Sequence, residues 1–175
     1  MPPWLTYTAA LLVVLMVPVL LFVAAGRLGL LAGKAPADLG LREGRLKAPS
    51  NRPNSVSSQA VLWPGHPQRA YASIAPLAVT GDGLAAMAKL RDVVETTPGA
   101  RMVQIDTRYL RAEFTTPLVR FTDDVEFWFD AAAGVVQVRS ASRLGYSDRG
   151  ANRARIEAVR ARLDAEREHL RGSHP

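Results

Sequence analysis

The chain has 175 residues, a formal net charge of +6 at pH 7 and no cysteine. This length fits one domain of about 100 to 150 residues with an appended segment and leaves little room for a second full domain. Without cysteine the chain cannot form a disulfide, a thiolate metal site or a cysteine nucleophile. Its positive charge would suit an anionic partner such as phospholipid headgroups. Solvation explains the charge more simply, because the basic residues are scattered among acids.

An apolar stretch opens the sequence. No charged side chain occurs from Met1 to Gly26, and residues 5–25 supply about the twenty apolar positions that a helix needs to cross a bilayer core. Trp4 and Tyr7 fall where interfacial aromatic residues are common, and Arg27 ends the stretch. We therefore predict that residues 1–26 are a transmembrane anchor and that the lipid bilayer is a partner of the chain.

A cleaved signal peptide is the alternative interpretation of this stretch. Val23, Ala24 and Ala25 resemble a small-residue cleavage site. A signal peptide, however, usually has basic residues before an apolar core of about 7 to 15 residues. Here the apolar core is longer and nothing basic precedes it, so the sequence favours an uncleaved, single-pass anchor.

Basic residues follow the apolar stretch, at Arg27, Lys34, Arg42 and Arg45. By the positive-inside rule this asymmetry would place the rest of the chain in the cytoplasm.

Residues 27–70 are rich in Gly, Pro, Ser and Asn and show no sustained periodicity, which predicts an extended linker. Its segment 50–59 is packed with turn-forming residues. This segment is either a turn-rich loop or a loop that binds a polar ligand.

Two amphipathic helices are predicted in the α+β domain that we assign to residues 71–170, before a tail at 171–175. Asp82 can cap a helix that runs to about Thr97, where Pro98 and Gly99 end it. The second helix covers about residues 152–169. Their apolar faces carry, respectively, Leu84, Met87, Leu90 and Val94, and Ile156, Val159 and Leu163.

Between the two helices, residues 101–143 alternate apolar and polar side chains with a period of two, which predicts four short antiparallel strands. Tight connections are expected at 115–117 and 131–134. The predicted fold is therefore α+β: an N-terminal transmembrane helix, then a four-stranded antiparallel sheet packed with two helices.

Polar residues crowd onto the last two predicted strands. Strict alternation would place Asp123 on the inner face, where a carboxylate needs a partner, whereas a bulge at Asp123 and Asp124 would turn it to solvent. Arginine pairs with a carboxylate through two bonds, so Arg139 and Arg143 on the neighbouring strand are the candidate partners.

Hydroxyl groups alternate with these arginines, at Ser140 and Ser142, before the turn that leads into the last helix. Such residues could cradle an anionic group near a helix N-terminus, or could form a buried network that joins sheet to helix. The candidate ligand-binding residues are Asp123, Arg139, Ser140, Ser142, Arg143, Tyr146 and Asp148.

Catalytic chemistry finds little support. The three histidines, His66, His169 and His174, lie far in sequence from the serines, and neither serine sits in a glycine elbow. Asp123, Asp124 and Glu126 cannot all reach one metal ion, because adjacent strand residues point to opposite faces. We predict no catalytic residue, no metal and no cofactor, and the sequence carries no nucleic-acid-binding motif.

Three blocks of the sequence resemble one known family. They are residues 53–58 (PNSVSS), 123–127 (DDVEF) and 139–148 (RSASRLGYSD). In them the chain resembles the bacterial and chloroplast family of domains of unknown function numbered 1499, over roughly residues 45–163. Members are often lipoproteins or membrane-anchored proteins, and plant relatives are associated with the thylakoid lumen. The resemblance therefore implies an exported domain on the bacterial inner membrane, facing the periplasm, against the charge asymmetry.

One departure from the family is informative. Many members have a cysteine at the position of Ser55 and an earlier one near that of Pro49, and such cysteines could pair in an oxidising compartment. Since both are absent here, that pair cannot be required for any chemistry of this chain. The family has no established activity to carry over.

Two functions remain as hypotheses. The first is a non-enzymatic accessory protein that binds a membrane complex, a lipid headgroup or an anionic envelope component. The second is a membrane-tethered enzyme or small anionic-ligand-binding domain that uses the cluster of Asp123, Arg139 and Arg143.

Overall fold

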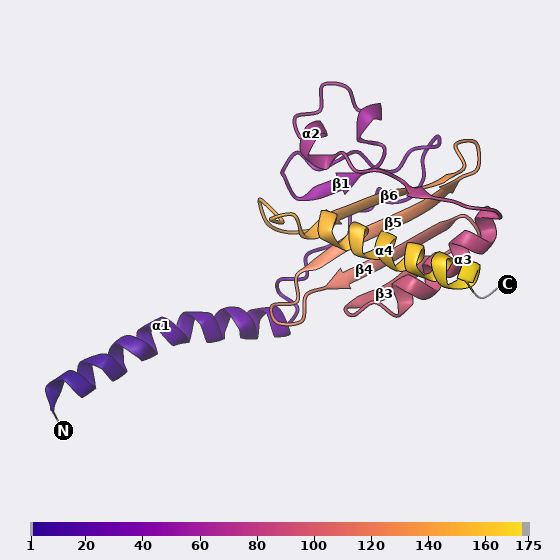
Figure 1. Cartoon of the computed structure of the whole chain (residues 1–175). Coiled ribbons are helices and arrows are strands. Elements are labelled where there is room, and N and C mark those ends of the chain that lie inside the picture. Colours follow the sequence, from indigo (N-terminus) through magenta and orange to yellow (C-terminus); the bar gives the residue numbers. More distant parts are fainter. Residues whose placement is uncertain (1, 173–175) are drawn as a thin grey trace.

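The computed structural model describes residues 2–172, which form one long helix and an α+β domain (Figure 1). The helix, α1 (Pro3–Arg27), leaves the domain at one end and carries the N-terminus away from it. It continues through Pro18, and its apolar side chains are almost all exposed. Its length and composition alone make it a candidate membrane span.

The sheet contains a meander of the four strands predicted from the alternation: β3 (Ala100–Ile105), β4 (Tyr109–Thr115), β5 (Thr122–Asp130) and β6 (Val135–Ser142). Two further strands, β1 (Ser55–Ser57) and β2 (Leu77–Ala78), pair with β6 at its free edge, which gives six antiparallel strands in place of four. Strands of three and two residues are too short to show a period of two, so the sequence pattern missed them.

Helices α3 (Gly83–Glu95) and α4 (Ala151–Gly172) cover one face of this sheet (Figure 1). Asp82 caps α3 as predicted, because its carboxylate accepts the Leu84 N–H at 3.0 Å. The predicted inward face of α4 is confirmed. On α3 the buried stripe includes Val93, while Leu84 at the start of the helix stays 43 % exposed.

The opposite face of the sheet is covered by part of the segment assigned to the linker. Leu46 is 1 % exposed there, and its N–H donates to the Gln59 side chain at 2.8 Å. After β1, the short helices η1 (Ala60–Leu62) and α2 (Arg69–Ala72) lead to β2. Much of residues 27–70 is therefore built into the fold.

The C-terminal end of α1 packs against the loop between β4 and β5. The rings of Phe22 and Phe121 lie 6.2 Å apart between centroids. Gly26 touches the backbone of Val119 so closely that a Cβ there would lie 2.3 Å from its carbonyl oxygen. The glycine allows this close approach, so the helix and the loop meet along their backbones.

Two glycines that end predicted elements provide a test of the packing. Gly99 and Gly134 both have positive φ, at 82° and 65°, but only a Cβ at Gly99 would meet a neighbour, the Thr115 carbonyl oxygen at 2.6 Å. We expect Gly134→Ala to cost about 1 to 2 kcal/mol of unfolding free energy from backbone strain. We expect Gly99→Ala to cost about 1 to 3 kcal/mol more, because the carbonyl must move. Urea unfolding of the detergent-solubilised chain, followed by circular dichroism, measures both; equal losses would contradict the close contact.

Candidate functional site

Asp123 lies on the helix-covered face of the sheet, as strict alternation predicts. The pairing of Asp123 with Ser142 and of Asp124 with Ala141 runs on without a bulge. Its ion-pair partner is Arg155 of α4. The expected pairing with Arg139 or Arg143 is wrong, because both of these arginines bind carboxylates on the other face of the sheet.

Arg155 connects α4 to the sheet through several groups at once. Besides Asp123, its guanidinium donates to Ser140 Oγ at 2.9 Å and to Asn152 Oδ1 at 2.7 Å. It also lies over the Phe114 ring, 4.9 Å from the centroid. A planar guanidinium can make such bonds at its edge while its face rests on an aromatic ring.

Asn152, at the start of α4, is fully buried and forms the centre of this network. Its Oδ1 also accepts a bond from Ser140, and its Nδ2 donates to Ser142 Oγ at 3.0 Å and to the Asn54 carbonyl oxygen at 3.0 Å. One amide side chain therefore joins β6, α4 and the segment before β1.

Asp148 caps the N-terminus of α4. Its carboxylate accepts the N–H groups of Gly150 at 3.1 Å and Asn152 at 2.9 Å, and the Tyr71 hydroxyl also donates to it. Burial alone would raise the pKa of Asp148, but these hydrogen bonds outweigh burial and lower the pKa below its ordinary value. The pKa of the Tyr71 hydroxyl is raised by burial and by its bond to this carboxylate.

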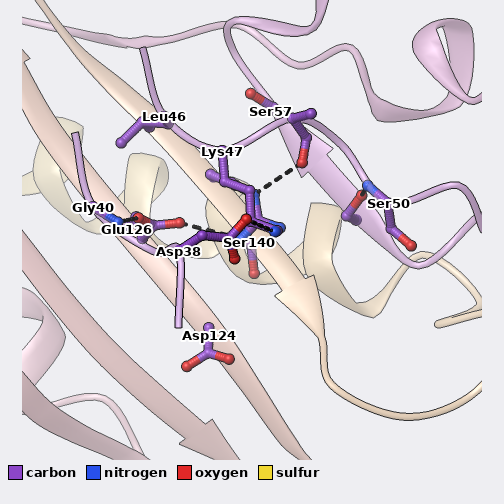
Figure 2. A network of polar contacts seen from close by, with 12 residues as sticks. Asp38, Gly40, Leu46, Lys47, Ser50, Ser57, Asp124, Glu126 and Ser140 are labelled. Carbon is purple, nitrogen blue, oxygen red and sulfur yellow. Dashed lines mark hydrogen bonds and ion pairs between the residues drawn. The ribbon is translucent and has the colours of Figure 1, made fainter. Parts of the chain in front are cut away.

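A second polar cluster lies on the opposite face of the sheet, beneath residues 38–48. Glu126, fully buried, accepts the Gly40 N–H at 2.8 Å, the Tyr109 hydroxyl at 2.8 Å and the Arg139 guanidinium at 3.2 Å. Figure 2 shows Gly40 beside Glu126, with Asp38 and Lys47 of the same covering segment nearby. Burial and the adjacent carboxylate raise the pKa of Tyr109, so its hydroxyl stays a donor.

Arg143 holds two further carboxylates on this face. It binds Asp124 through two bonds of 2.8 and 2.7 Å, and Glu113 of the neighbouring strand through a third. Burial alone would raise the pKa of Glu113, but its bonds from Arg143 and Arg101 lower the pKa instead. The two carboxylates face each other across β4 and β5, and Arg143 bridges them.

The seven residues predicted as a ligand site therefore lie in separate places. Ser140 is buried in the network on the helix side, whereas Arg139 and Arg143 are on the other face. Asp123, Ser142 and Asp148 line a hollow of about 230 Å³ at the end of the domain near α1, with Phe121, Leu144 and Arg149. Tyr146 is 72 % exposed and belongs to neither network.

Sequence reasoning missed Asn152 and Arg155. A signal for them was present, because Asn152 lies four residues before Ile156 and Arg155 four before Val159, on the face already predicted to be buried. Asn54 and Tyr71 had no such signal, because Asn54 lies in an irregular segment and Tyr71 in α2, a helix of only four residues.

The arrangement offers little for catalysis. His66 lies in the loop before α2, where its Nδ1 accepts the Gln68 N–H. Among the described residues, no group of three histidines or carboxylates could hold a metal ion. Ser140 and Ser142 are hydrogen-bonded to Asn152, and the buried carboxylates form ion pairs with arginines.

Residues 45–163 match the model of a family described as a protein of unknown function, DUF1499. No curated protein and no solved structure matches the chain. The three sequence blocks that resemble this family meet in space, since β1 pairs with β6 and β6 with β5. Their loops are joined as well, because the Asp148 N–H donates to the Pro53 carbonyl oxygen.

The buried pair of Glu126 and Arg139 can be tested by breaking it from either side. Glu126→Gln or Arg139→Gln alone should each cost about 3 to 5 kcal/mol of unfolding free energy, because each leaves one charge buried without its partner. The double variant should lose less than the sum of the two, since a neutral amide pair remains. The control is Arg101→Gln in the exposed pair with Glu113, which should cost about 1 kcal/mol or less. Additive losses in the double variant would contradict the pairing.

Asp148 should make the stability of the chain depend on acid pH. Because its pKa is lower in the folded state than in the unfolded chain, its contribution is present above the unfolded value of about 3.9 and is lost as the pH falls through the folded value. Asp148→Asn keeps a residue that caps helices but cannot be protonated there. We expect the unfolding free energy of the variant to fall less than that of the wild type between about pH 5 and pH 3. Equal losses of unfolding free energy in the variant and the wild type over this pH range would contradict this role.

Proposed function

We propose that the chain is a non-enzymatic accessory protein, held at a membrane by α1, that binds a component of the membrane or envelope. The chain belongs to the DUF1499 family, which is described only as a protein of unknown function, so the proposal is argued from the residues of the chain itself. The observation that carries this proposal is the contrast between α1, whose apolar side chains are almost all exposed, and a domain whose buried charges are already paired.

The dimensions of α1 support the anchor. Its 25 residues extend about 37 Å at 1.5 Å per residue, which exceeds the roughly 30 Å hydrocarbon core of a bilayer. Exposed apolar side chains surround it on all sides, as lipid contact requires. A cleaved signal peptide would lose the contact between Phe22 and Phe121, whereas an anchor keeps it.

The engagement of the polar residues supports a non-enzymatic role. A general acid or base must reach a substrate and exchange a proton with it. Asp123, Asp124 and Glu126 are instead buried and paired with arginines, which is typical of a structural network. The hollow beside Asp123 and Ser142 is the place where a small ligand could still bind.

We place the chain in the bacterial inner membrane with its domain on the periplasmic side. The resemblance to exported relatives supports this side, while the basic residues after α1 favour the cytoplasmic one. A reporter enzyme that is active in only one compartment, fused after Pro175, distinguishes the two.

Extraction of membranes tests the anchor. The full chain should stay in the membrane pellet after washing with alkaline carbonate, and mass spectrometry should find residues 4–25 still attached. A matched variant, Leu15→Arg with Leu20→Arg, puts two charges in the middle of the span at a cost of about 2.5 to 3.5 kcal/mol each, and should move the chain toward the soluble fraction. Mature protein that begins near Gly26, or wild type that washes off, would contradict the proposal.

A further inference from the structure

The end of the domain from which α1 leaves carries a distinctive surface. Four segments meet there: residues 26–37, 49–54, 116–121 and 143–150. Gly26 contacts Val119, Gly33 contacts Leu144, and Asn54 bonds to Gly145. Figure 1 shows the loop before β5 and the loop before α4 at this same end of the molecule. We call these four segments the proximal surface.

Large apolar side chains on the proximal surface are left uncovered. Leu28 and Tyr146 are 78 % and 72 % exposed, and three other residues share this character: Leu30, Leu118 and Leu144. They continue the apolar surface of α1 sideways onto the domain, since the helix packs on the loop that holds Leu118. Exposed apolar groups gathered at one end of a domain are a common feature of interaction sites.

The charges of the proximal surface are almost all of one sign. Its exposed basic residues are Arg27, Lys34, Arg52, Arg120 and Arg149. Its one carboxylate, Asp148, is committed to Tyr71 and to the cap of α4. The opposite end of the domain carries charges of both signs, with Asp82, Asp106 and Asp130 beside Arg91 and Arg108. Basic side chains beside apolar ones, together with an exposed tyrosine, are the composition that binds an anionic membrane interface.

We propose that the proximal surface lies on the bilayer, with Leu118 and Tyr146 at the level of the headgroups and the arginines among lipid phosphates. This inference rests on the proposed span of α1, which brings these segments to the membrane. The contact fixes the domain against the bilayer and turns the opposite end, which holds Asp106 and Asp130, away from it. The hollow lined by Asp123 and Ser142 then opens beside lipid headgroups.

The absence of natural cysteine allows a clean test with single labels. Leu118→Cys, Tyr146→Cys, Leu15→Cys and Ala133→Cys are each labelled with an environment-sensitive fluorophore, and the full chain is placed in nanodiscs that contain nitroxide lipids. We expect labels at 15, 118 and 146 to lose most of their emission, and the label at 133, in the turn between β5 and β6 at the opposite end of the domain, to keep it. Loss at 15 without loss at 118 and 146 would overturn this inference and leave the anchor standing. No loss at 15 would overturn both. A surface made for a protein partner would leave 118 and 146 as unquenched as 133, because the disc holds only this chain.

The basic residues are tested with the same labels. Quenching at 146 should be stronger in discs of anionic lipid than in zwitterionic ones, and the difference should shrink at high salt. Arg120→Glu should abolish that difference. The matched control Arg108→Glu, an exposed arginine in the turn between β3 and β4, should preserve it. Equal behaviour of the two variants would overturn the assignment of the arginines to lipid phosphates.

Discussion

The rest of the structure depends on carboxylates that are buried on both faces of one strand and need charged partners. Asp123, Asp124 and Glu126 on β5 lie under α3 and α4 on one side and under residues 38–48 on the other. A buried carboxylate without a partner would cost more free energy than a small domain can lose. Each covering layer or neighbouring strand therefore brings an arginine: Arg155 on the first side, Arg139 and Arg143 on the second. The positions of α4 and of the covering segment follow from these pairs.

The cluster around Glu126 also ties the segment that follows α1 to the sheet. Glu126 holds the N–H of Gly40, only thirteen residues after the end of α1. Phe22 and Gly26 pack α1 against the loop between β4 and β5. The middle of β5 and the loop before it are thus connected to the end of α1 and to the segment that follows it, and the domain is not suspended on a free tether. A chain fixed in this way can keep one surface turned toward the bilayer.

Much of the fold could be predicted because it repeats with a period. The alternation on β5, the cap at Asp82 and the inward face of α4 all depend on local spacing, which one sequence contains. The partner of Asp123 could not be predicted, because it depends on where α4 crosses the sheet, and the candidates on β6 proved to face the other way. β1 and β2 carry too few residues for a pattern. Asn54 reaches the site from an irregular segment and Tyr71 from the four-residue helix α2, and only tertiary contacts define the paths of both.

The distribution of paired and unpaired groups locates where binding can occur. Some side chains in the sheet are bonded to arginine or to Asn152, and they would have to break two or three hydrogen bonds before they could contact a ligand. Each buried polar group left without its partner would add a further cost in free energy. Side chains on the proximal surface carry no such cost, because Leu118, Tyr146 and Arg149 are already exposed. The buried networks therefore act as the rigid support of the loops at this end, and these loops provide the exposed surface on which the proposed bilayer contact depends.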